Sequence, residues 1–129
     1  MANPNIVNVT SILGVTTYYT PSGTSAVSLL SNGAASGHVY KIDSLVAANT
    51  SGSAVNCTVS YYTKATTQGS APSGGTAYPI ASTVSVPANA SLVVVEKSNG
   101  FYLTEDACIS ITSGTANNLT FTVSYEDIS

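Results

Sequence analysis

The sequence is poor in charge. Of its 129 residues 7% are charged, with three lysines, no arginine and six carboxylates, whereas about 25% is typical of soluble domains. A nucleic-acid-binding surface needs cations against phosphates, and a net charge of −3 without arginine excludes that class. A membrane span needs about 18 consecutive apolar residues, but the best apolar run, residues 92–95, stops at Glu96. We therefore expect neither nucleic acid nor a membrane as a partner.

Residues that carry chemistry are also scarce. His38 is the only histidine, and no Gly-X-Ser-X-Gly motif accompanies it, so a nucleophilic triad has little to build on. The adjacent acids at 105–106 and 126–127 lie where strands are expected to end, which is typical of solvated charge. We expect no enzyme, no cofactor and no metal, with a small hydrolase as a disfavoured alternative. The change His38→Ala is expected to cost less than about 0.5 kcal/mol.

The two cysteines are predicted to be free thiols. Cys57 alternates with Val59 and Tyr61, whereas Cys108 is out of phase with its apolar neighbours Ala107 and Ile109. On regular strands Cys57 therefore faces the core and Cys108 faces away from it. The opening residues show no basic or apolar signal-peptide region, which favours a chain assembled in the cytoplasm, where disulfides are rare. A disulfide between the two cysteines stays open as an alternative if a bulge reverses one register.

Short alternating runs predict the fold. Residues 119–125 alternate apolar and hydroxyl-bearing side chains, and residues 56–62 repeat the pattern. Such runs, bounded by Gly, Pro, Asn and Ser, are typical of half-buried strands, and no segment shows a helical apolar period. Further strands are predicted at residues 6–12, 15–20, 26–30, 39–47, 78–86, 92–96, 101–103 and 108–112. We expect an all-β, antiparallel β-sandwich of eight to ten short strands, jelly-roll-like or immunoglobulin-like.

The chain is expected to form one domain over residues 1–129. Two halves of about 60 residues would each be marginal alone, so the Gly/Ser/Thr-rich segment 64–76 is interpreted as a long surface loop. Residues 1–20 are interpreted as an N-terminal arm or an edge strand. Their opening Asn-Pro-Asn is polar, while apolar residues recur along the rest of the segment, a pattern suited to adding to a neighbour's sheet edge.

Tyrosines supply the candidate interface. One member of each doublet, Tyr18-Tyr19 and Tyr61-Tyr62, must face outward on a strand, and Tyr62 is the outward member because Tyr61 shares the face of Cys57. Outward tyrosines can anchor a protein interface or stack on sugars, although the absence of Trp weakens the sugar interpretation. The predicted interface residues are Ile6, Val9, Ile12, Tyr18, Tyr19, Tyr62, Phe101 and Tyr102.

The surface of the folded chain is also expected to be poor in charge. Nine charged side chains over roughly 6,300 Å² give about one per 700 Å², several-fold below what colloidal solubility usually requires. Hydroxyl and amide groups lose less on leaving water than charged groups do, and they can re-pair across a contact. The composition therefore favours a subunit packed against others over a free enzyme.

Several segments resemble small β-rich virion proteins of tailed bacteriophages, particularly those infecting marine cyanobacteria. The resemblance rests on residues 1–7, 39–42, 77–81, 86–88, 92–97, 101–106 and 122–129. It implies a virion structural protein on the outer capsid surface, with capsid decoration as the leading role, the major capsid protein as partner and self-association as a homotrimer. A tail, neck or fibre component, with or without glycan binding, is the alternative. Residues 13–36 differ from the family and leave the mode of attachment open.

Overall fold

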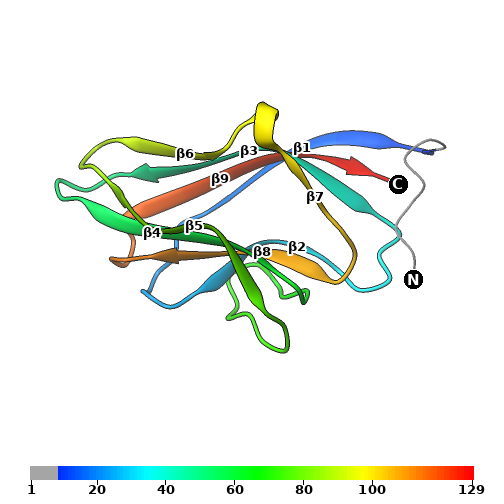
Figure 1. The fold of residues 1–129 in the computed structure, drawn as a ribbon, viewed down its shortest axis with the longest axis horizontal. Coiled ribbons are helices and arrows are strands. Elements are labelled where there is room, and N and C mark those ends of the chain that lie inside the picture. Colours follow the sequence, from blue (N-terminus) through cyan, green and yellow to red (C-terminus); the bar gives the residue numbers. More distant parts are fainter. Residues whose placement is uncertain (1–8) are drawn as a thin grey trace.

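The computed structural model describes residues 9–129, which form nine strands and one short 3-10 turn (Figure 1). The strands are β1 (Ile12–Tyr19), β2 (Val27–Asn32), β3 (Val39–Asn49), β4 (Val55–Tyr62), β5 (Ala77–Val86), β6 (Ser91–Val95), β7 (Phe101–Leu103), β8 (Ala107–Ser113) and β9 (Leu119–Ile128), with the turn η1 (Lys97–Asn99) between β6 and β7. All strand pairs are antiparallel. The predicted all-β, single-domain sandwich is confirmed.

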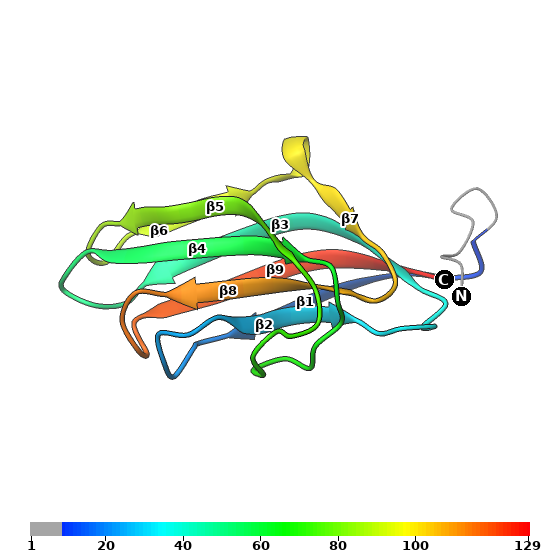
Figure 2. The same ribbon diagram turned by 60° about the horizontal axis from the view of Figure 1, so that its bottom comes forward.

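The strand order identifies a jelly roll. Sheet A runs β1-β9-β3-β6, with β7 also pairing with β3, and sheet B runs β2-β8-β4-β5. If β6 and β7 count as one interrupted strand, the first strand pairs with the last, the second with the next to last, and so on inward, as in a long hairpin rolled onto itself (Figure 2). This nested pairing is the jelly-roll arrangement. The order thus decides between the two sandwich types that the sequence left open.

Strand β9 shows how alternation builds the core. Leu119, Phe121 and Val123 are fully buried, and the threonines between them are partly exposed. Side chains at every second position point between the sheets, where they meet Ile109 and Ile111 of β8. Seventeen buried residues form this single cluster, within an accessible surface of 6258 Å². The inward phase predicted for residues 119–125 is confirmed.

The N-terminal strand differs from the prediction. One strand, β1, covers residues 12–19 where strands at 6–12 and 15–20 were expected. The expected break at Gly14 does not occur, because β1 pairs with β9 without a register shift from Ile12 to Tyr19. A glycine weakens a strand interior, but continuous pairing on one side holds it in place. The edge-strand interpretation therefore applies to residues 12–19, whereas residues 1–8 lie outside the described part of the chain.

The segment 63–76, which we call the strap, covers the outer face of sheet B. The strap carries no strand, as predicted, but it is pinned along its length. Lys64 Nζ donates to Asp106 Oδ2 at 2.8 Å, and the backbone N–H of Thr66 donates to Ser31 Oγ at 3.1 Å. Farther along, the N–H of Gly75 donates to the hydroxyl of Tyr62 at 3.0 Å. The strap is therefore a fixed cover over one sheet.

The cover explains the burial of both thiols. Cys57 belongs to the core cluster, whereas Cys108 lies outside it, on the outer face of sheet B, and both are fully buried. The opposite orientations predicted from the sequence are confirmed, and both thiols are free. Burial raises the pKa of Cys57 to about 11 and also raises the pKa of Cys108, so both groups stay protonated and unreactive near neutral pH.

Opening of the strap should expose Cys108 alone. We expect Cys108 to be alkylated faster than Cys57, because local opening is more frequent than opening of the sandwich. Asp106→Asn removes the ion pair with Lys64 and should speed labelling of Cys108 several-fold without changing Cys57, as read by mass spectrometry of digested peptides. Glu96→Gln, an exposed acid away from the strap, is the control. Equal acceleration of both thiols would contradict a separately opening strap.

Acid should loosen the same contact. Hydrogen bonds from Lys64 and from the N–H of Ala65 lower the pKa of Asp106. A carboxylate with a lowered pKa contributes stability above its unfolded pKa, and that contribution is lost as the pH falls through the folded value. Hydrogen exchange at Ala65 should therefore accelerate, relative to the core strands, below about pH 4.

Candidate docking surface

Within residues 9–129, no segment covers the outer face of sheet A as the strap covers sheet B, although Val39 and Ile128 at one end of that face are buried. Register fixes which residues lie on it: Tyr19 pairs with the buried Phe121, so Tyr18 points to the opposite, outer side. Val93 pairs with Val46 and Tyr102 with Lys41, both outside the core cluster. We call this surface the open face. Its members include Ile12, Thr16, Tyr18, Lys41, Val46, Val93, Tyr102, Thr120, Thr122, Ser124 and Glu126.

Large apolar side chains stand exposed on the open face. Tyr18 is 68% exposed, Val93 58%, Ile12 56% and Tyr102 46%. These residues come from β1, β6 and β7, so they span the sheet from one edge to the other. Exposed tyrosines with apolar neighbours are the anchors that protein interfaces favour.

Hydroxyl pairs fill the space between these anchors. Thr16 Oγ1 and Ser124 Oγ lie 3.0 Å apart, and the Oγ1 atoms of Thr20 and Thr120 lie 2.9 Å apart. The ion pair on this face joins Lys41 Nζ and Glu126 Oε2 at 3.6 Å, and half-exposed pairs of this kind contribute little to stability. The open face can therefore be desolvated at lower cost than a surface of unpaired charges.

The open face contains three of the predicted interface residues. Ile12, Tyr18 and Tyr102 are exposed on it, as expected. Val93 is not among the predicted interface residues, since it lies inside the apolar run 92–95 and shows no alternation. Val9 is half-buried ahead of β1, and Ile6 lies outside the described residues.

Three other predicted interface residues are not exposed on the open face. Tyr19 and Phe101 point inward and pack partly buried against the core, because they pair with Phe121 and Ile42. Tyr62 does point away from the core, as predicted, but it is only 9% exposed because the strap lies over it. The alternation gives the side of a sheet, and it cannot show what covers that side.

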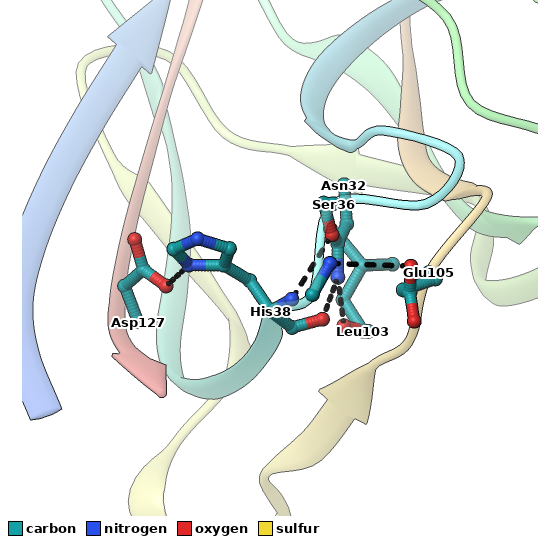
Figure 3. Close-up of polar contacts among 7 residues, drawn as sticks. Asn32, Ser36, His38, Leu103, Glu105 and Asp127 are labelled. Carbon is teal, nitrogen blue, oxygen red and sulfur yellow. Dashed lines mark hydrogen bonds and ion pairs between the residues drawn. The ribbon is translucent and has the colours of Figure 1, made fainter. Parts of the chain in front are cut away.

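A polar cluster closes one end of the sandwich, where β2, β3, β7 and β9 meet (Figure 3). His38 Nδ1 and Asp127 Oδ1 lie 2.5 Å apart. The ring of His38 contacts the edge of Tyr40, which packs against Tyr125 at a centroid distance of 4.8 Å. Burial, and next the charge of Asp127, raise the pKa of Tyr40, so its hydroxyl stays neutral. The cluster ties strand ends together.

The hydroxyl nearest His38 is already engaged. Ser36 Oγ donates to Asn32 Oδ1 at 2.5 Å and accepts from the backbone N–H of His38 at 3.1 Å. A serine nucleophile would instead bond to a ring nitrogen of the histidine. This geometry gives His38 a structural role at the chain's end.

The contact with Asp127 changes the expectation for His38. The change His38→Ala removes a half-buried hydrogen bond, so we expect the free energy of unfolding to fall by about 1 kcal/mol, more than the sequence suggested. Urea unfolding at neutral pH measures this, with His38→Asn and His38→Gln as variants that retain a donor. A change within about 0.3 kcal/mol would show that the pair contributes nothing.

Two buried asparagines were missed by the sequence analysis. Asn32 Nδ2 donates to the carbonyls of His38 and Leu103 at 2.9 and 3.0 Å, which joins sheet B to sheet A. Asn49 Nδ2 donates to the carbonyls of Ser53 and Val86 at 2.8 and 3.0 Å. Both lie where turn residues were predicted. Their only sequence signal is an Asn at the end of an apolar run.

A hollow of about 500 Å³ lies beside the strap at the β1/β2 side of the sandwich. Leu29 and Leu30 line it with Tyr125, and Thr17, Ser31 and Thr66 contribute hydroxyls. Gln68 Nε2 bridges its rim, donating to the carbonyl of Leu29 at 2.8 Å and to Thr17 Oγ1 at 3.3 Å. The lining is uncharged, so the hollow suits a neutral ligand with hydroxyl groups.

Among residues 9–129, no three His, Cys, Asp or Glu side chains converge as metal ligands. Within that same range no helix is long and apolar enough to cross a membrane. The chain matches no model of a known protein family, and a search of curated proteins finds no similar sequence.

Proposed function

We propose that this chain is a virion structural protein of a tailed bacteriophage. In this proposal it is a decoration protein that binds the outside of the assembled capsid in many copies, with the major capsid protein as partner. It performs no catalysis and holds no cofactor. The observation that carries the proposal is a difference between the two sheets. The strap covers part of sheet B, whose exposed large apolar side chains lie on its edge strand β5, whereas the open face of sheet A exposes tyrosine, valine and isoleucine from one edge to the other on a surface of hydroxyls.

The chemistry of the open face supports a broad contact with little charge, since the ion pair of Lys41 and Glu126 lies among hydroxyls and apolar side chains. Threonine and serine hydroxyls can exchange their mutual hydrogen bonds, such as Thr16 to Ser124, for bonds to a partner. The exposed rings of Tyr18 and Tyr102 supply large rigid contact area with few rotatable bonds. Strand β1 belongs to residues 1–20, the segment interpreted from the sequence as an arm or edge strand that adds to a neighbour. We propose that the contact also extends across sheet A to β6 and β7.

Binding in many copies would stabilise a shell by mass action. A protein that binds the assembled capsid and not free capsid subunits shifts the equilibrium toward assembly. Capsids that lack the chain should therefore lose their genome at a lower temperature. The jelly roll does not decide the role alone, since it is shared by capsid and lectin domains.

The alternative is a tail, neck or fibre component that binds glycans. The hollow beside the strap favours it, because Tyr125, Gln68 and several hydroxyls line an uncharged space. Neutral sugars are bound by such combinations of an aromatic ring with hydroxyl and amide groups.

Copy number distinguishes the two roles. We expect the chain to approach the abundance of the major capsid protein in purified virions, measured by band intensity on a gel or by quantitative mass spectrometry. A decoration protein occupies many equivalent sites, whereas a tail contains few copies of each component. An abundance of a few copies per virion would contradict capsid decoration and favour the alternative.

A further inference from the structure

Within residues 9–129, no strand pairs with the outer edge of β1, and the strap bonds to that edge through Gln68, at the carbonyl of Tyr18. Strand β1 pairs with β9 on one side, and its eight residues contain no proline and no charged side chain. Its pairing with β9 has no register shift. Unprotected edges invite pairing with another strand, so proteins normally block them.

The other edges of the sandwich are blocked. The strap pairs with β2, where the N–H of Ser28 donates to the carbonyl of Ser70 at 2.9 Å and the N–H of Gly69 donates back at 2.8 Å. Strand β5 carries Pro79 and two register shifts against β4. The last edge is split into β6 and β7 by the turn η1. Against this background, the regular edge of β1 stands out as a site for strand addition.

The hydrogen bonds of β9 show which groups of β1 point outward. Ser11 and Ser129 exchange both of their backbone bonds, at 3.0 and 2.9 Å. In an antiparallel ladder the bonded residues alternate, so the odd-numbered residues of β1 bond to β9. The N–H and C=O groups of Ile12, Gly14, Thr16 and Tyr18 therefore face the open edge. Gln68 Nε2 reaches the carbonyl of Tyr18 at 3.4 Å, which confirms the direction.

We propose that two copies of this chain pair through β1, antiparallel, across a two-fold axis at Val15. In this register Ile12 lies opposite Tyr18 of the second copy, and Gly14 lies opposite Thr16. All the outward backbone groups of both strands are then bonded. Two of the three exposed apolar side chains of the strand, Ile12 at 56% and Tyr18 at 68%, meet directly on the open face. A strand that satisfies itself in this way is self-complementary, as a two-fold interface requires.

This self-complementarity identifies the partner of the β1 edge as a second copy of the chain. One edge accepts one strand, so pairing stops at two copies and joins both A sheets into one continuous sheet. The resemblance to phage virion proteins led us to expect a homotrimer, and the β1 edge replaces it with a dimer as the state in free solution. This inference does not depend on the proposed capsid role.

A symmetric disulfide tests the register. On the two-fold axis Val15 faces its own copy as a non-bonded pair, where Cα atoms lie about 4.5 Å apart, within the range that a disulfide spans. We expect Val15→Cys to form a covalent dimer of twice the 13.0 kDa chain mass at least tenfold faster than Val93→Cys. Val93 is 58% exposed, whereas Val15 is half-buried, and Val93 lies on the opposite edge of sheet A, so exposure alone would favour the control. Equal rates for both variants would overturn the proposal.

A proline variant tests the edge without the disulfide. Thr16→Pro removes an N–H that β9 does not use, and proline is tolerated on the open side of an edge strand. It should weaken dimerisation at least tenfold in sedimentation equilibrium, whereas Thr16→Val should not. Circular dichroism checks that both variants fold. If Thr16→Pro does not fold, Ile12→Lys serves as a second variant that blocks the edge. A wild-type chain that sediments as a monomer or trimer would contradict the dimer.

Discussion

Capsids stripped of this chain should bind the wild-type protein and fail to bind the double variant Tyr18→Lys, Tyr102→Lys. Central aromatic anchors contribute about 2 kcal/mol or more each, and each 1.4 kcal/mol is a tenfold change in affinity. The two changes together should therefore weaken binding several-hundred-fold. Each lysine also brings a charge that must leave water on docking. Co-sedimentation of labelled protein with capsids measures the loss.

The matched control is Tyr78→Lys. Tyr78 is 59% exposed, close to the values for Tyr18 and Tyr102, but it lies on β5 of sheet B. This variant should bind capsids like the wild type. If Tyr78→Lys lost as much affinity as the double variant, the open face would not be the docking surface. Binding of the double variant at wild-type affinity would lead to the same conclusion.

Asn32→Ala should lower the free energy of unfolding by about 3 kcal/mol. The side chain is fully buried and takes part in three hydrogen bonds, to the carbonyls of His38 and Leu103 and to the hydroxyl of Ser36. Each bond is worth about 1 kcal/mol, and a buried carbonyl left without a donor costs more. Small domains have only about 5–15 kcal/mol in total, so the loss should be plain in urea unfolding.

Asn56→Ala is the control for this effect. Asn56 lies on β4 with an exposed side chain, so its change should stay within about 0.5 kcal/mol. Asn32→Asp retains an acceptor for Ser36 and loses the two donated bonds, so it should also be strongly destabilised. A loss below about 1 kcal/mol for Asn32→Ala would show that the contact between the sheets is not important for stability.

Local alternation predicted most of the fold. Residues 101–103 form a strand with the expected bounds, and β4 and β8 each extend the predicted runs by one residue at one or both ends. Each strand buries one face in the core, so apolar residues alternate along its sequence and can be recognised locally. The pairing order is not local, and the sequence therefore left the jelly roll and the immunoglobulin-like fold open.

The segments that cover outward-pointing side chains could not be predicted either, because they too come from distant parts of the chain. The phase of Tyr62 and Cys108 was correct, but the strap that buries both comes from residues 63–76, whose Gly and Ser content indicates only a loop. Asn32 and Asn49 follow predicted strands, where the sequence predicts turns and polar side chains usually meet solvent. Their partners, such as Leu103 and Val86, come from distant parts of the chain.

Part of the candidate site could be derived from the sequence. A tyrosine doublet guarantees one outward ring, but the sequence named both Tyr18 and Tyr19, and the register with β9 identifies Tyr18 as the outward one. Which of several outward rings share one sheet depends on pairing, so the association of Tyr18 with Tyr102 and Val93 emerged only from the strand order. The sequence is poor in charge, which first suggested a subunit packed against others. In the structure, the open face carries hydroxyls between exposed apolar side chains.

Cryo-electron microscopy of intact virions tests the central claim most directly. The account predicts a jelly roll repeated over the outside of the shell, with β1, β6 and β7 of sheet A against the major capsid protein and the strap turned toward solvent. Density for the chain confined to the tail, or bound to the shell through the strap with the open face toward solvent, would contradict it.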